Sequence, residues 1–368
     1  MRCSISGGGT GGHIYPALAV ARALLDVRPD AELAYIGGAR GFERRLVAGD
    51  ALRDRLPYHE LLVRSLRSSG RDVHLVLDPL RLAASVPQAT ILLRRLRPAV
   101  LFTTGGYLAL PLVLAARILR VPSMVWEGNV VPGRATRAVG RLATRVAVSF
   151  PPTAEAFGER AFVSGTPIRS FAGIDRDAAR ASFGVARDER LLLAFGGSQA
   201  VARFADAILG SLERVLPDWH VLHITGEAGL ADAAAARDRL PAHLRDRYLP
   251  EPFLTHRMGD ALVAADLVLG RAGSSTCAEV AAVGVASVLV PYPHAGAHQR
   301  ANAGYLAEQG AALLVADEEL DADRLAALAA QLRDDGRRAA MAAAARALGQ
   351  PDAARRLADE LVQLAGEA

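Results

Sequence analysis

The chain has 368 residues and a formal net charge of +4, and 51% of its residues are hydrophobic. This length allows two domains of ordinary size. The sequence contains no run of 18 uninterrupted apolar residues, so no membrane-spanning helix is predicted. All 43 basic residues are arginine, which excludes a P-loop and Schiff-base catalysis, since both need a lysine.

The first half of the chain opens with a strand over 2–6, which runs into five glycines within six residues and then into a helix over 14–27. Strands and helices alternate after it. Strands are predicted at 32–36, 99–103, 123–126, 145–149 and 161–163, and helices near 41–49, 79–96, 109–118 and 132–142. This alternation predicts an α/β fold with a parallel, doubly wound sheet, whose ligand crevice lies at the carboxyl ends of the strands.

The same pattern restarts after Gly165–Arg169, with a buried strand over 191–195 that ends in Gly196-Gly197-Ser198-Gln199. Strands are then predicted at 220–224, near 249–253, at 266–269 and at 286–290, and a final helix at 352–365. We therefore expect a first domain over 1–165, a second Rossmann-like domain over 166–345, and a C-terminal helical segment over 346–368. The two cysteines, Cys3 and Cys277, are too few for a disulfide framework and indicate a reducing cytoplasm.

Charge is distributed unevenly between the halves. Residues 1–165 contain 22 arginines and 12 acidic residues, whereas residues 166–368 contain 21 and 27. The basic surplus is densest at 64–97, where Arg71 and Arg81 stand among Val73, Leu75, Val76, Leu77, Leu80 and Leu82. This mixture favours an anionic membrane surface as a partner, with a solvated helix as the alternative. Nucleic-acid binding is poorly supported, because the basic segment lacks interleaved aromatic residues.

The glycine turn at 7–12 suits a phosphate or diphosphate, since glycines let backbone N–H groups approach a ligand at a helix N-terminus. Gly7-x-Gly9-x-x-Gly12 matches the dinucleotide fingerprint, which needs an acidic residue at the end of the second strand. That strand ends in Gly37-Gly38 with no carboxylate, which argues against a nicotinamide cofactor. The other interpretation gives the chemistry to His13, a titratable side chain at the mouth of the turn, rather than a role in capping or packing.

A second candidate phosphate site follows the strand over 266–269. Ser274, Ser275 and Thr276 open a helix, where hydroxyls cap free N–H groups and the N–H groups themselves bind a diphosphate. Glu279, one turn further on, has a carboxylate that can accept both hydroxyls of a ribose. An ordinary capped helix is the alternative. The segment 291–302 then offers a polar cluster, including His298 and Gln299, that suits the hydroxyls of a sugar.

Metal binding is not expected. His294 and His298 have i,i+4 spacing, but a glycine lies between them and no carboxylate is near. The formal Asp-x-Asp triplets that begin at Asp175 and Asp321 stand at helix starts, where aspartate is a normal N-cap. We assign no metal and no cofactor.

Together, these motifs resemble the MurG family. The matching segments run in order over nearly the whole chain: Gly8–His13, Gly105-Gly106-Tyr107, Glu127 with Asn129, Gly165–Arg169, Gly196–Gln199, Arg271 to Glu279, and His298-Gln299. The resemblance implies a GT-B fold, with two Rossmann-like domains facing across a cleft and the last helix crossing back to the first domain. It also implies a peripheral enzyme at the cytoplasmic face of the membrane. Its reaction would be the inverting transfer of GlcNAc from UDP-GlcNAc to the MurNAc C4 hydroxyl of undecaprenyl-pyrophosphoryl-MurNAc-pentapeptide (lipid I), giving lipid II for peptidoglycan.

The resemblance also implies roles for single residues. His13 is the candidate general base, with Glu127 in reserve, and Gly105-Gly106 favours a lipid diphosphate acceptor. The remaining binding residues are Thr10, Gly11 and Gly12 for the phosphates, Asn129, Arg169 and Ser198 for the donor, Ser274, Ser275, Thr276 and Glu279 for the diphosphate and ribose, and His298 and Gln299 for the GlcNAc hydroxyls. The sequence departs from the family pattern at Trp126, Gly128 and Ala200.

Two other functions fit parts of this pattern. A GT-B relative such as a UDP-GlcNAc 2-epimerase would share the donor site and lack the lipid acceptor. A non-catalytic scaffold that binds a nucleotide sugar is the other alternative, because a fold and remnants of a site do not guarantee activity.

Overall fold

The computed structural model describes residues 1–39, 43–61, 74–196, 202–254, 256–293 and 297–366, with side chains except over 74–83 and at 202. The chain forms two compact units. The N-terminal unit comprises Met1–Ile168 and Pro351–Ala368, and the C-terminal unit comprises Arg169–Gln350. Within the described residues, no helix is both long enough and apolar enough to cross a membrane.

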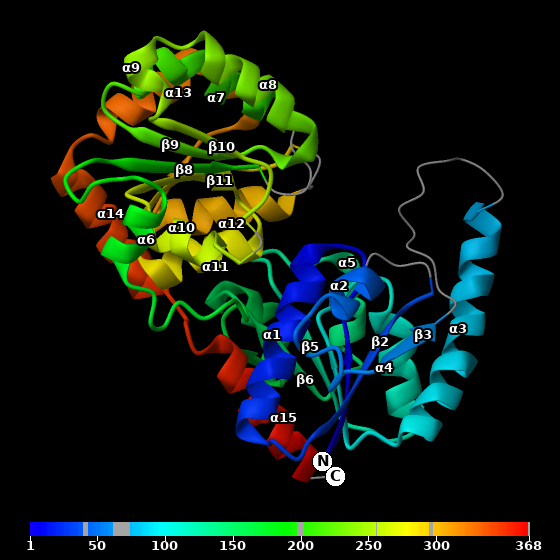
Figure 1. The fold of residues 1–368 in the computed structure, drawn as a ribbon. Coiled ribbons are helices and arrows are strands. Elements are labelled where there is room, and N and C mark those ends of the chain that lie inside the picture. The colour runs from blue at the N-terminus through cyan, green and yellow to red at the C-terminus, as the bar shows by residue number, and fades with distance from the viewer. Residues whose placement is uncertain (40–42, 62–73, 197–201, 255, 294–296, 367–368) are drawn as a thin grey trace. The chain divides into compact units, whose positions relative to one another are not determined.

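The N-terminal unit is built on a seven-stranded parallel sheet with the strand order β3-β2-β1-β4-β5-β6-β7 (Figure 1). The strands are β1 (Arg2–Ser6), β2 (Glu32–Gly38), β3 (Tyr58–Leu61), β4 (Val100–Thr103), β5 (Ser123–Glu127), β6 (Arg145–Val148) and β7 (Ala161–Val163). The chain leaves β1 towards β2 on one side and later returns to β4 on the other. Loops that follow β1 and β4 therefore meet at the point where the strand order reverses, which is where ligands bind in such sheets.

Helices cover both faces of this sheet. On one face, Ile5 and Phe102 pack in a buried cluster with Leu18 of α1 (Gly11–Val27) and Leu361 of α15 (Ala353–Gly366). The other face packs residues such as Leu101 and Val125 against α3 (His74–Leu96) and α4 (Ala109–Ile118). Successive strand residues point to opposite faces, so two-sided burial explains why the strands read as continuous apolar runs. The unit also contains α2 (Glu43–Ala48), α5 (Arg134–Gly140) and the short 3₁₀ helices Pro151–Ala156 and Gly158–Arg160.

The C-terminal unit repeats this design with a six-stranded parallel sheet, in the order β10-β9-β8-β11-β12-β13. Its strands are β8 (Leu191–Phe195), β9 (His220–Ile224), β10 (Tyr248–Glu251), β11 (Leu267–Arg271), β12 (Ala286–Val290) and β13 (Leu313–Leu314). Figure 1 shows α7, α8, α9 and α13 on one face of the sheet and α6, α10, α11, α12 and α14 on the other. Their bounds are α6 (Arg176–Ser182), α7 (Ala202–Val215), α8 (Gly226–Arg239), α9 (Ala242–Arg245), α10 (Met258–Ala264), α11 (Ser274–Val283), α12 (Ala297–Glu308), α13 (Ala322–Gln331) and α14 (Asp335–Leu348), with a 3₁₀ helix at Asp317–Glu319.

The prediction of two doubly wound α/β units is confirmed. Two strands were not predicted, namely β3 and β13. β3 is a four-residue edge strand of mixed polarity, and β13 has only two residues, so neither gives a hydrophobic pattern. The helix predicted to begin at 79 begins at His74, and the strand predicted to end at 269 continues to Arg271.

Candidate functional site

The first glycine turn lies between β1 and α1. Thr10 is the N-cap of α1, in an extended conformation and without a side-chain capping bond. Gly11 and Gly12 are the first two helical residues. The first N–H groups of a helix have no partner within it and carry the positive end of the helix dipole. The three residues predicted to line phosphates therefore stand where an anion is favoured.

The first and second glycine turns pack directly against each other. A Cβ atom at Gly7 would lie 2.5 Å from Thr104 Oγ1 and 2.6 Å from the His13 carbonyl oxygen. Gly106, with φ +76°, would place a Cβ 2.8 Å from the carbonyl oxygen of Gly8. Since backbone cannot move aside as a flexible side chain can, glycine is required at these contacts. The turns that follow β1 and β4 are thus packed closely against each other, and together they form one surface, the floor of the candidate site.

His13 is held above this floor by Thr104. Its Nδ1 lies 2.7 Å from the Thr104 carbonyl oxygen, and Thr104 Oγ1 donates to the His13 carbonyl oxygen at 2.8 Å. A carbonyl oxygen only accepts, so Nδ1 carries the proton and the lone pair of the neutral ring is on Nε2. The ring is half-buried, and a Cβ at Gly105 would lie 3.7 Å from its Cε1. This tautomer suits a general base acting through Nε2.

Glu127, the predicted reserve base, ends β5 and organises the loop that follows. Its Oε1 accepts from the backbone N–H and the side-chain amide of Asn129, both at 2.9 Å. Its Oε2 accepts from the Gly133 N–H at 3.3 Å. Thr153 Oγ1 also donates to the Asn129 carbonyl oxygen at 3.0 Å. Both carboxylate oxygens of Glu127 thus accept hydrogen bonds from the loop that follows β5.

In the C-terminal unit, the loop between β11 and α11 presents the second predicted phosphate site. Gly273 is the N-cap of α11, and Ser274, Ser275 and Thr276 are its first three helical residues. The prediction that their hydroxyls cap the helix is wrong, since no side-chain capping bond exists there. The glycine cap in an extended conformation leaves the helix start accessible to an anion through its N–H groups.

Glu279 points back from α11 towards Arg169. The Arg169 Nε donates to Glu279 Oε1 at 2.8 Å, and only 7% of Glu279 is exposed. Burial raises the pKa of the Glu279 carboxyl, and the Arg169 charge and hydrogen bond oppose that rise. Two residues that were assigned to the donor are therefore brought together.

Helix α12 carries the residues predicted to contact a sugar. His298 and Gln299 lie in its first turn and are half-buried. Gln299 Oε1 accepts from the Tyr292 N–H at 2.8 Å, and Asn302 donates to the Ala272 carbonyl oxygen at 3.2 Å. The latter bond ties α12 to the loop before α11. Ser198, with its neighbours Gly197, Gln199 and Ala200, lies outside the described residues, as does His294.

Over the described ranges, no group of three or more His, Cys, Asp or Glu side chains is arranged to hold a metal ion. The two Asp-x-Asp triplets have the capping role expected of them. Asp175 accepts from the Ala178 N–H at 2.8 Å, and Asp321 accepts from the Arg324 N–H at 2.7 Å.

Comparison with known proteins identifies the chain. It matches the glycosyltransferase family 28 N-terminal domain over residues 3–148 and the family 28 C-terminal domain over residues 191–357. It is 38% identical to the UDP-N-acetylglucosamine–N-acetylmuramyl-(pentapeptide) pyrophosphoryl-undecaprenol N-acetylglucosamine transferase of Desulforudis audaxviator, over 100% of this chain and 99% of that protein. The protein of the same name from Moorella thermoacetica is 40% identical, over 96% of each chain. The chain belongs to this transferase family.

Solved structures agree with this assignment. A crystal structure of Acinetobacter baumannii MurG covers 98% of the chain and 99% of its own length, with 28% identity and a TM-score of 0.78. The GT-B fold and the resemblance to MurG are thus confirmed. A structure described as a UDP-N-acetylglucosamine 2-epimerase from Listeria monocytogenes has a TM-score of 0.68 at 16% identity, which shows a shared fold only.

One departure from the MurG pattern has a structural explanation. Trp126 is 2% exposed and packs in the core beneath α1 and α15, and its Nε1 donates to the Gly165 carbonyl oxygen at 3.1 Å. The side chain therefore serves the packing of the N-terminal unit in this transferase.

The sequence analysis missed Glu43 and Thr104, which contact the glycine turns. A carboxylate does lie at the end of β2, because Glu43 folds back to the Gly38 N–H, but it is fully buried.

Proposed function

We propose that this transferase moves GlcNAc from UDP-GlcNAc to the MurNAc C4 hydroxyl of lipid I, giving lipid II for peptidoglycan. The relatives carry both substrates in their names. The observation that carries the proposal is the bond between His13 Nδ1 and the Thr104 carbonyl oxygen, at the mouth of an anion-binding turn. It prepares one nitrogen to take a proton from an acceptor that carries a diphosphate.

The proposed chemistry is a single displacement. His13 Nε2 removes the proton of the C4 hydroxyl while that oxygen attacks the anomeric carbon of GlcNAc. The bond from the anomeric carbon to UDP breaks on the opposite side, so the configuration inverts. Thr10, Gly11 and Gly12 supply the N–H groups for the acceptor diphosphate, and Gly105-Gly106 closes the floor beside them.

The C-terminal unit would bind the donor. The start of α11 at Ser274–Thr276 offers N–H groups and a helix dipole to the diphosphate. Glu279 would accept the ribose hydroxyls, and Arg169, which is paired with it, would bring positive charge to the departing UDP. Asn129, Ser198, His298 and Gln299 are proposed as further donor contacts.

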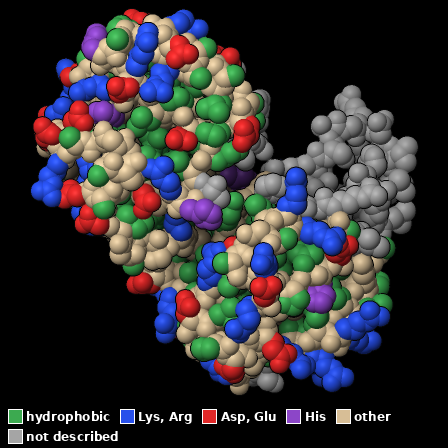
Figure 2. All heavy atoms as spheres, in the orientation of Figure 1, with side chains coloured by type: hydrophobic (Ala, Val, Ile, Leu, Met, Phe, Trp, Pro, Cys, Tyr) green, Lys and Arg blue, Asp and Glu red, His purple; other side chains and the backbone are tan. Residues whose placement is uncertain are grey.

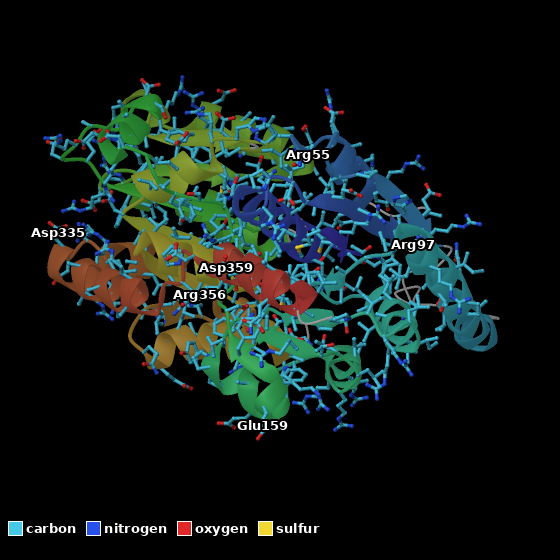
Figure 3. All side chains as sticks on the ribbon, turned by 90° about the horizontal axis from the view of Figure 1, so that it is seen from below. Arg55, Arg97, Glu159, Asp335, Arg356 and Asp359 are labelled. Atoms are coloured by element: carbon cyan, nitrogen blue, oxygen red, sulfur yellow. The ribbon has the colours of Figure 1, made fainter. Side chains whose placement is uncertain are left out.

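We also propose that the enzyme binds peripherally to the anionic, cytoplasmic face of the membrane. Between Pro79 and Trp126 the sequence contains six arginines and no acidic residue. On α3 and α4, which pack on one face of the sheet, Ile91 is 53% exposed and Ile118 is 61% exposed. Their exposed arginine neighbours are Arg94, Arg95, Arg97, Arg117 and Arg120. Figure 2 shows blue side chains gathered near the lower end of α3, and Figure 3 labels Arg97 there. Apolar side chains within a basic surface are the pattern of an interfacial site.

Product analysis tests the proposal against its alternatives. The protein is incubated with UDP-GlcNAc alone and with UDP-GlcNAc plus a short-chain lipid I analogue, and the products are identified by mass spectrometry. We expect UDP and a disaccharide lipid only when the acceptor is present. UDP-ManNAc formed without an acceptor would instead identify an epimerase, and UDP-GlcNAc binding without any turnover would identify a scaffold.

A further inference from the structure

Glu43 is a buried carboxylate at the acceptor side of the N-terminal unit to which the proposed reaction gives no role. It is the first residue of α2 and is 0% exposed. Its Oε1 accepts from the Gly38 N–H at the end of β2, at 3.0 Å. A buried carboxylate is costly unless hydrogen bonds compensate for the lost water, so its position calls for a reason.

The same oxygen reaches the second glycine turn. Tyr107 directly follows Gly105-Gly106, and its hydroxyl donates to Glu43 Oε1 at 2.6 Å. Burial, and then the hydrogen bond from this hydroxyl to Glu43, raise the pKa of Tyr107. The hydroxyl therefore stays protonated at neutral pH and keeps donating to Glu43.

Glu43 and Tyr107 also support the first glycine turn. A Cβ at Gly8 would lie 3.1 Å from Glu43 Oε1 and 3.2 Å from Tyr107 Cε1. At Gly9, with φ +94°, it would lie 3.8 Å from the same ring. The backbone of this turn therefore rests on the Tyr107 ring and on the carboxylate that holds it.

The two carboxylate oxygens of Glu43 are in different environments. Its Oε2 is buried and has no hydrogen-bond partner among the residues that the structure describes. A neutral side chain with one acceptor oxygen could make the same two bonds to Gly38 and Tyr107. Only one oxygen of Glu43 is therefore needed for these contacts, and it is needed as a hydrogen-bond acceptor rather than as a charge.

We propose that Glu43 is a positioning residue for the acceptor. Through Tyr107 it fixes the spacing between the turn at Gly8–Gly12 and the turn at Gly105-Gly106, and so sets the N–H groups that bind the acceptor diphosphate. Glu43 touches neither substrate. This inference rests on the proposed function, which assigns both turns to the acceptor.

The test measures steady-state kinetics with a lipid I analogue and the binding of UDP-GlcNAc by calorimetry. For Glu43→Ala we expect KM for the acceptor to rise about ten- to a hundredfold, because the half-buried Tyr107 hydroxyl and the buried Gly38 N–H lose the oxygen that accepts from them, and we expect the donor Kd to stay unchanged. Glu43→Gln keeps a side-chain oxygen that can accept both hydrogen bonds. Its KM should therefore be within about threefold of wild type, a smaller change than the loss of one hydrogen bond would cause. In a double-mutant cycle, Glu43→Ala and Tyr107→Phe should be less than additive, because they share one bond.

Tyr58→Phe is the matched control, since it removes a hydroxyl that donates to the Gly38 carbonyl oxygen at 2.9 Å but contacts neither glycine turn. It should leave the acceptor KM unchanged. Glu43→Ala with a normal acceptor KM would overturn the inference, as would Glu43→Gln as impaired as Glu43→Ala, or equal losses in donor and acceptor binding. A wild-type enzyme that transfers no GlcNAc would instead overturn the proposed function.

Discussion

At the scale of single residues, Thr104 decides which nitrogen of the neutral His13 ring carries the proton. Its carbonyl oxygen fixes the proton on Nδ1, and its hydroxyl donates to the backbone of His13. A histidine without this contact would divide its population between two tautomers, and only one of them would have its base at Nε2. Thr104 is 1% exposed, so the contact is shielded from water.

The glycine turns give a prediction at the same scale. Gly106→Ala combines a positive φ with a contact of 2.8 Å to the Gly8 carbonyl oxygen. Gly158→Ala is the matched control, with φ +59° and no atom within 4 Å of the added Cβ. We expect the control to lose about 1 kcal/mol of unfolding free energy, the cost of the left-handed conformation. Gly106→Ala should lose more and should also abolish transfer, as urea unfolding and an activity assay would measure. Equal losses in both variants would contradict the packing of the two turns.

At the scale of elements, long apolar strands and periodic helices were predictable, whereas features that depend on partners were not. β3 forms because β2 offers it an edge, which no pattern in Tyr58–Leu61 reveals. The N-cap of α11 is Gly273, whose backbone is extended. Ser274 and Thr276 therefore lie inside the helix rather than at the N-cap position. In β3, pairing with the neighbouring strand overrides the weak local propensity.

Helix α15 has a stability role that can be measured. Leu361 is 0% exposed and packs in the cluster shared by α1 and the sheet. Leu361→Ala should lower the unfolding free energy of the N-terminal unit by about 2–5 kcal/mol, the usual cost of a large-to-small change in a core. Arg355→Ala, on the same helix, removes only an exposed pair with Asp359 and should cost about 0.5 kcal/mol or less. Urea unfolding of both full-length variants makes the comparison, and similar values would contradict the docking of α15.

The strand pair β9 and β10 predicts a dependence of stability on pH. His223 Nδ1 lies 2.9 Å from the Tyr248 hydroxyl, and burial lowers the pKa of His223 from 6.5 to about 4. Since the unfolded chain takes up this proton first, the stabilisation present above pH 6.5 is lost as the pH falls towards 4. His223→Phe lacks this proton uptake. As the pH falls from about 7 to about 5, the wild type should therefore lose about 2 kcal/mol more unfolding free energy than the variant. A difference that does not change with pH would show that His223 remains neutral in both states or charged in both.

At the scale of the whole molecule, the charge asymmetry between the halves predicts where membranes bind. Reversing Arg94 and Arg95 to Glu should weaken binding to vesicles that contain anionic lipid by about tenfold or more, since each surface charge contributes about 1 kcal/mol. Arg214→Glu with Arg324→Glu applies the same change in net charge to α7 and α13 and should leave binding unchanged. Vesicle flotation measures both, and equal weakening would assign the effect to net charge alone.

The candidate site was predictable to the extent that it lies in turns after strands. Parallel strands bring such turns to one edge, which is why the ligand crevice was expected at the carboxyl ends of the strands, where Gly7–Gly12 and Gly105-Gly106 lie. Thr104 and Glu43 were missed because their roles depend on packing at that edge: Thr104 acts partly through its backbone, and Glu43 reaches back five residues to Gly38. Nothing in the sequence indicated that the Trp126 indole donates a hydrogen bond to the Gly165 carbonyl oxygen.

The central claim is that His13 Nε2 activates the acceptor hydroxyl for glycosyl transfer. The measurement that tests it most directly is the rate of labelled GlcNAc transfer from UDP-GlcNAc to a short-chain lipid I analogue, for wild type and His13→Ala at saturating substrates. We predict transfer by wild type and a kcat about 10²–10⁴-fold lower in the variant, the usual contribution of a general base. A variant kcat within about tenfold of wild type, below that range, would contradict the role of His13, and no transfer by wild type would contradict the proposed reaction.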